Sequence, residues 1–81
     1  MTSKLQQFPM DRLDLSDKVV TAWETFPGGP GGTPEENLHL IRMELHILKK
    51  LKVQRPSKAD KIDSLIGRYQ AIAQSLKAKA N

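Results

Sequence analysis

The chain has 81 residues, 38% of them hydrophobic, no cysteine, and a formal net charge of +4 at pH 7. A chain of this size forms one domain and buries only about 60–65% of its unfolded surface, so association with another chain is a common way for it to gain stability. The absence of cysteine excludes disulfides and thiolate metal sites, and no apolar run approaches the ~20 residues that a membrane-spanning helix needs. The N-terminus lacks the apolar core of a signal peptide, so we expect a cytoplasmic protein.

The charge is unevenly distributed along the chain. Residues 1–36 hold three basic and six acidic groups, a net of −3, whereas residues 37–81 hold ten basic and three acidic groups, a net of +7. We therefore expect the C-terminal part to be attracted to acidic partners.

The N-terminal third predicts a flexible tail, residues 1–10, followed by a short helix, residues 11–26. Asp14 or Ser16 is expected to cap this helix, and Trp23 and Phe26 are expected to anchor it to the rest of the protein. Its apolar residues at helical spacing, which predict the buried face, are Leu15, Val19, Ala22, Trp23 and Phe26.

Residues 27–33 are rich in glycine and proline and predict a linker, since no periodic pattern survives there. A phosphate-binding loop would end in Gly-Lys-Ser or Gly-Lys-Thr after a strand. Here Gly32 is followed by Thr33 and Pro34, so the linker interpretation is favoured. The linker would allow the first helix to pack on its own chain or to reach a neighbouring one.

The segment from residue 34 to residue 53 carries the strongest helical pattern in the chain. Thr33 predicts an N-cap, Pro34 suits the first helical position, and Glu36 is placed to complete a capping box. Two apolar seams run along this helix and cover roughly 200° of its circumference, which is more than one neighbour can bury. The first seam is Leu38, Ile41, Leu45 and Leu48, and the second is Leu40, Met43, Ile47 and Leu51.

Pro56 ends this helix, and Ser57 is expected to cap the next one, residues 58–79, together with Asp60. That last helix has one narrow apolar stripe, with Gly67 on its outer side. Two helices of similar length joined by a short turn form an antiparallel αα-hairpin. The sequence thus predicts an all-α fold, a long hairpin with a shorter N-terminal helix on a Gly/Pro linker, arranged as a three-helix bundle or as an oligomeric helical bundle.

The second seam is the leading candidate for function. Either the N-terminal helix covers it in a monomer, or it binds a second copy or another protein. We favour the latter and expect a small non-enzymatic interaction or regulatory protein that forms a dimer or a higher oligomer. The candidate protein-interaction residues are Trp23, Phe26, Leu40, Met43, Ile47 and Leu51.

A basic cluster surrounds the predicted hairpin turn and gives the alternative, a nucleic-acid-binding accessory protein. Its residues, which would contact phosphates or an acidic partner, are Lys49, Lys50, Lys52, Arg55, Lys58 and Lys61. No aromatic residue lies among them, so any such binding would be non-specific. A solvated hairpin end explains the same lysines without any ligand.

Metal binding and catalysis find little support in the sequence. His39 and His46 are seven residues apart, about 10 Å along a helix, so one metal ion cannot bind both. Glu35 and His39 offer only two ligands. There is no cysteine, no plausible Ser-His-acid grouping and no facing pair of carboxylates, so we expect no enzymatic activity and no cofactor.

Overall fold

The computed structural model describes residues 11–26 and 29–80, and these form three α-helices and no strand. The helices are α2 (Arg12–Thr25), α3 (Pro34–Gln54) and α4 (Ala59–Ala80). The prediction of an all-α chain is thereby confirmed. The expected tail, residues 1–10, and the first two residues of the linker lie outside the described part of the chain.

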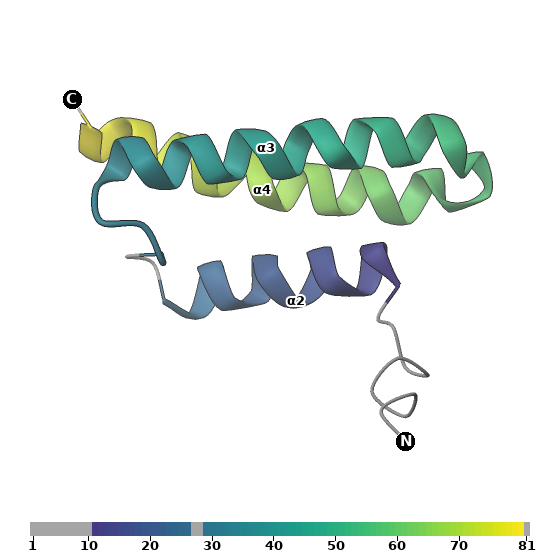
Figure 1. Ribbon diagram of the computed structural model, residues 1–81, viewed down its shortest axis with the longest axis horizontal. Helices are drawn as coiled ribbons and strands as arrows, with labels where there is room; N and C mark the ends of the chain where they lie inside the picture. Colours follow the sequence, from purple (N-terminus) through teal and green to yellow (C-terminus); the bar gives the residue numbers. More distant parts are fainter. Residues whose placement is uncertain (1–10, 27–28, 81) are drawn as a thin grey trace, which may run out of the picture.

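The helix α3 and the helix α4 lie side by side and antiparallel, joined by a 3₁₀ turn at Pro56–Lys58 (Figure 1). At the start of α3, the hydroxyl of Thr33 accepts a hydrogen bond of 3.1 Å from the amide of Glu36, and Pro34 occupies the first helical position. The cap expected from Ser57 was wrong, because Ser57 lies inside the 3₁₀ turn, whose N-cap is Arg55 and which has no side-chain cap. Instead, the amide of Lys58 donates to the carbonyl oxygen of Arg55.

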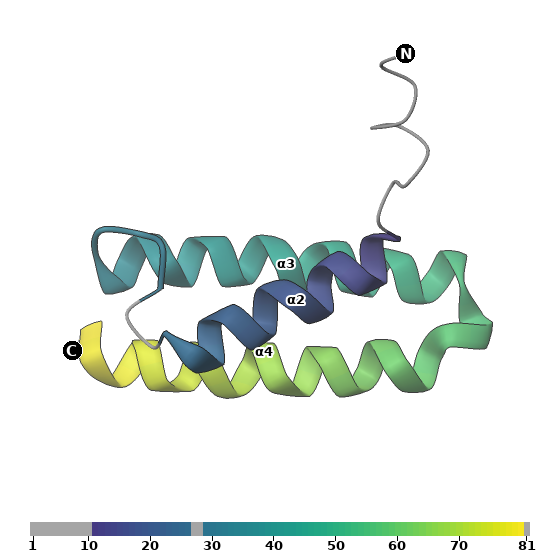
Figure 2. The same ribbon diagram turned by 90° about the horizontal axis from the view of Figure 1, so that it is seen from below.

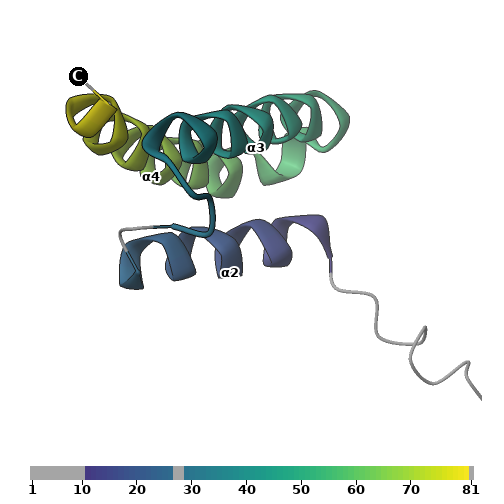
Figure 3. The same cartoon turned by 60° about the vertical axis from the view of Figure 1, so that its left-hand side comes forward.

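The helix α2 crosses the hairpin obliquely and packs mainly on α4 (Figure 2). Its N-terminal end lies over α3 and its C-terminal end lies over α4 in Figure 2, so α2 and α3 diverge toward the linker. Figure 3 shows that all of α2 lies on one side of the hairpin. The N-cap is Asp11, whose carboxylate accepts from the amide of Leu13 at 2.9 Å, so the expected caps, Asp14 and Ser16, were wrong.

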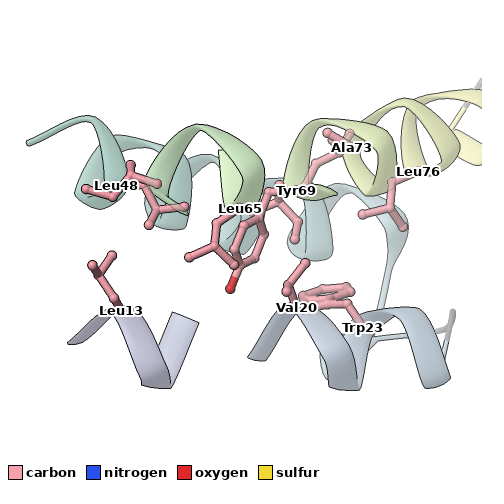
Figure 4. Packing of buried hydrophobic residues seen from close by; sticks show 11 residues of the cluster. Leu13, Val20, Trp23, Leu48, Leu65, Tyr69, Ala73 and Leu76 are labelled. Carbon is pink, nitrogen blue, oxygen red and sulfur yellow. The ribbon is translucent and has the colours of Figure 1, made fainter. Parts of the chain in front are cut away.

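The core lies between α2 and the two helices of the hairpin (Figure 4). Its buried hydrophobic residues are Leu13, Val20, Trp23, Leu38, Ile41, Leu48, Ile62, Leu65, Tyr69, Ala73 and Leu76. The first seam of α3 is thus buried, since Leu38, Ile41 and Leu48 belong to the core and Leu45 packs against it. No described helix is both long enough and apolar enough to cross a membrane.

The face of α2 that meets the hairpin differs from the predicted one. Its buried residues are Leu13, Ser16, Val20 and Trp23. Trp23 anchors the helix as expected, but Phe26 is 70% exposed and Leu15 is 41% exposed, so their prediction as buried contacts was wrong. The apolar residues of α2 cover about half of its circumference, and charge pairs flank the part that is buried.

Those charge pairs connect α2 to both hairpin helices. On the α4 side, Arg68 forms ion pairs with Asp17 at 3.1 Å and with Glu24 at 2.6 Å. On the α3 side, Arg12 forms an ion pair with Glu44 at 2.5 Å. Rotating α2 to bury Leu15 would turn its acidic residues away from Arg68.

The described part of the linker is held in place by contacts with its two neighbouring helices. The amide of Gly31 donates a hydrogen bond of 2.6 Å to the side-chain oxygen of Asn37, which is itself buried. Gly29 has a φ of 71°, and a Cβ atom there would lie 2.1 Å from Cζ3 of Trp23. The linker therefore fixes the C-terminal end of α2 against the start of α3.

Candidate protein-interaction surface

An apolar surface runs across α2, the linker and α3 where the two helices diverge. It consists of two grooves of about 390 and 240 Å³ that share Val19, Trp23 and Pro30. The first groove continues along α2 to Ala22 and Phe26. The second continues onto α3. We call this continuous area the α2–α3 surface, and its residues are Val19, Ala22, Trp23, Phe26, Pro30, Leu40, Met43 and Ile47.

Large hydrophobic side chains on this surface remain in contact with solvent. Phe26 is 70% exposed, Met43 is 51% exposed and Leu40 is 39% exposed. Ile47 is partly buried beside them. Scattered single hydrophobic residues on a surface need no explanation, but a continuous group across two helices is typical of an interaction site.

A polar network joins α2 to α3 beside the second groove, and of its members Glu44 lines that groove. Arg12 donates to Ser16 at 2.8 Å as well as to Glu44, and the hydroxyl of Ser16 donates to Glu44 at 3.1 Å. Ser16 is fully buried, and a buried hydroxyl needs hydrogen-bond partners, which Arg12 and Glu44 provide. This network connects α2 to α3 on the side of the groove that Glu44 lines.

The six predicted interaction residues differ in how much of each side chain is exposed on this surface. Phe26, Leu40, Met43 and Ile47 line it and keep exposed or partly exposed area. Trp23 is only 5% exposed and contributes to the core as well as to the groove wall, while Leu51 packs against the core. Val19, Ala22 and Pro30 also line the surface, and no pattern in the sequence separated this face of α2 from its buried face.

Half of the predicted basic cluster forms ion pairs within the chain. Arg55 forms an ion pair with Asp11 at 2.8 Å, and Lys61 forms one with Asp14 at 3.3 Å. Lys52 pairs with Asp63 at 2.8 Å. Among the described residues, three members of the cluster have no ion pair, namely Lys49, Lys50 and Lys58. The acidic N-terminal part of the chain thus neutralises part of the basic hairpin end.

Two carboxyl groups that face the hairpin have lowered pKa values. Asp11 accepts two hydrogen bonds from Arg55, at 2.8 and 3.1 Å, and this lowers the pKa of Asp11 to about 2. Hydrogen bonds from Arg68 lower the pKa of Glu24 below its usual value. These shifts arise from ion pairs that position α2, and they do not indicate a catalytic acid or base.

The two histidines lie exposed on α3, where His39 and His46 line a shallow depression with Met43. Within the described ranges, no group of three or more histidine, aspartate or glutamate side chains is arranged to hold a metal ion.

Comparison of the chain with protein-family models, with curated proteins and with solved structures found no match.

Proposed function

We propose that this chain is a small non-enzymatic interaction protein, an adaptor, anti-activator or assembly factor that binds through the α2–α3 surface. The observation that carries the proposal is the continuous apolar area around Phe26, Leu40 and Met43, which keeps exposures of 39–70% beside a well-packed core. Burying such an area on a partner is favourable by roughly 25 cal/mol for each Å² removed from water. We take the protein to act in the cytoplasm, as its sequence leads us to expect.

The geometry of the surface favours a helix as its binding partner. The two grooves form a shallow apolar channel between a helix pair, and an amphipathic helix placed in such a channel buries residues at positions i, i+3 and i+4. Pro30 of the linker lines both grooves, and its neighbour Gly31 is held by a hydrogen bond to Asn37. The surface is therefore present before binding, which lowers the entropic cost of association.

The nucleic-acid alternative loses support from the ion pairs at the hairpin end. Three of the six basic residues named for it are paired with acids of the same chain. A phosphate would have to compete with those carboxylates, or bind the remaining three lysines alone. We therefore place protein interaction first.

A photo-crosslinking residue at position 43 tests the proposal in the source cells. Val53 provides the matched control, because it lies on the same helix, is 83% exposed and lines neither groove. We expect covalent adducts of defined mass from position 43 and none of that mass from position 53. Equal labelling at both positions, or adducts at neither, would overturn the proposal.

A further inference from the structure

One stripe of α3 has a pattern suited to pairing with another helix. Residues spaced alternately four and three apart lie on one side of the helix, as in the heptads of coiled coils. All of them are exposed or partly exposed. We call this stripe the heptad seam, and its residues are Glu36, Leu40, Met43, Ile47, Lys50 and Gln54.

The charges of the heptad seam are arranged symmetrically about its centre. Glu36 lies seven residues before Met43, and Lys50 lies seven residues after it. Each charge is therefore about 10 Å from Met43 along the helix axis, and both lie on the same face. The seam thus has an acidic end, an apolar middle and a basic end.

Neither Glu36 nor Lys50 has an ion-pair partner within the described residues. For Glu36 this differs from most acids of the chain. Six of the nine acidic residues take part in ion pairs, and Glu36 is not among them. The reciprocal half of the capping box, in which the Glu36 carboxylate would accept from the amide of Thr33, is not made. The Glu36 carboxylate and the Lys50 ammonium group thus face solvent on the seam.

We propose that the partner on the α2–α3 surface is a second copy of this chain, with the two α3 helices packed antiparallel about a two-fold axis beside Met43. This arrangement brings Glu36 of each copy to the level of Lys50 of the other, so two opposite-charge pairs form by one symmetry operation. The apolar residues Leu40, Met43 and Ile47 meet in the middle. A parallel pair would instead place like charges together at both ends.

The helix α2 adds to the same interface. Its exposed apolar face borders the heptad seam through the groove that joins Val19 to Met43 and Ile47. A helix laid along the seam would also cover this groove. The inference rests on the proposed function, because it names the occupant of the same surface.

Charge exchange gives a test that depends on the antiparallel arrangement. We expect the wild type to sediment as a dimer, and we expect E36K and K50E to weaken it by about tenfold or more in dissociation constant, since each creates two like-charge pairs. An equimolar mixture of E36K and K50E should form a mixed dimer, because both of its end pairs are again opposite in charge. The double variant E36K/K50E should also dimerise.

The neighbouring residues Glu35 and Lys49 supply matched controls. Both are exposed, carry the same charges and lie off the seam, so E35K and K49E change the net charge and the helix ends in the same way. We expect both to remain dimeric. Circular dichroism and thermal unfolding of every variant verify that the helices still form.

A second pair of variants tests the apolar centre. M43E should give a folded monomer, whereas V53E, at a more exposed position outside the seam, should leave the dimer intact. A wild type that is monomeric at all concentrations, with adducts from position 43 to a different protein, would overturn the second-copy inference and leave the proposed function standing. A dimer that tolerates both M43E and the single charge variants would overturn the inference as well. If such a dimer also gives no crosslinks from position 43, the proposed function is overturned together with the inference.

Discussion

The hydroxyl of Tyr69 on α4 donates a hydrogen bond of 2.7 Å to the backbone carbonyl oxygen of Ser16 on α2. The Tyr69 side chain is fully buried, and its hydroxyl points toward α2 in the core (Figure 4). The bond joins two residues that are far apart in the sequence and fixes the position of α2 along α4. It therefore helps to place one wall of the α2–α3 surface.

We predict that Y69F lowers the free energy of unfolding by about 1 kcal/mol, because the ring stays and one buried hydrogen bond is lost. Urea unfolding followed by the fluorescence of Trp23 measures this change. Burial raises the pKa of Tyr69, so the fold favours its neutral form. Wild-type stability should therefore fall more steeply than that of Y69F as the pH rises above the usual tyrosine value of about 10. Equal stabilities for the two proteins at neutral pH would contradict the prediction.

We predict that the Arg12–Glu44 pair contributes a coupling energy of about 1 kcal/mol in a double-mutant cycle of R12A and E44A. The pair is partly buried, with side-chain exposures of 28% and 18%, and it shares Ser16. The Lys52–Asp63 pair is the control, because its exposures of 45% and 54% leave it in solvent. We expect the coupling energy of the Lys52–Asp63 pair to be close to zero. A larger coupling energy for Lys52–Asp63 than for Arg12–Glu44 would show that the Arg12–Glu44 network does not hold α2.

We predict that acid weakens the attachment of α2. The lowered pKa values of Asp11 and Glu24 mean that the fold favours their charged forms. Their stabilising contribution is present at pH values above the usual carboxyl range of about 4, and for Asp11 it is lost as the pH falls toward about 2. Unfolding curves at a series of pH values, followed by Trp23 fluorescence, measure the loss.

The variant R55Q is the control for this acid dependence, because Arg55 is the main cause of the lowered pKa of Asp11. We expect a shallower fall in stability between pH 4 and pH 2 for R55Q than for the wild type. High salt should reduce the difference, since exposed ion pairs are screened. If the stability of R55Q and that of the wild type fall equally between pH 4 and pH 2, a group other than Asp11 causes the acid dependence.

We predict opposite effects of alanine at two glycines. G29A should lower the free energy of unfolding by about 2 kcal/mol, because the added Cβ would lie 2.1 Å from the ring of Trp23 and the backbone φ is 71°. G67A should raise it by about 1 kcal/mol, because Gly67 lies within α4 with nothing within 4 Å of an added Cβ. Thermal unfolding of the two variants checks both signs. An unchanged stability for G29A would mean that Gly29 does not pack tightly against the Trp23 ring.

The sequence determined which segments are helical and where the hairpin turns. Local signals were sufficient for this, since Thr33 and Pro34 start α3 and Pro56 ends it through hydrogen bonds and sterics within a few residues. The heptad spacing around Met43 is likewise a property of the sequence alone.

Only the tertiary structure decided which face of α2 is buried and which remains free for a partner. Apolar residues cover about half of that helix, so periodicity alone could not separate the buried Leu13 and Val20 from the exposed Leu15 and Phe26. Groups distant in sequence flank the buried face, since Arg68 pairs with the acids on one side of α2 and Glu44 pairs with Arg12 on the other. Three other ion pairs engage half of the basic cluster, since Lys52, Arg55 and Lys61 pair with acids that only the fold brings close to them.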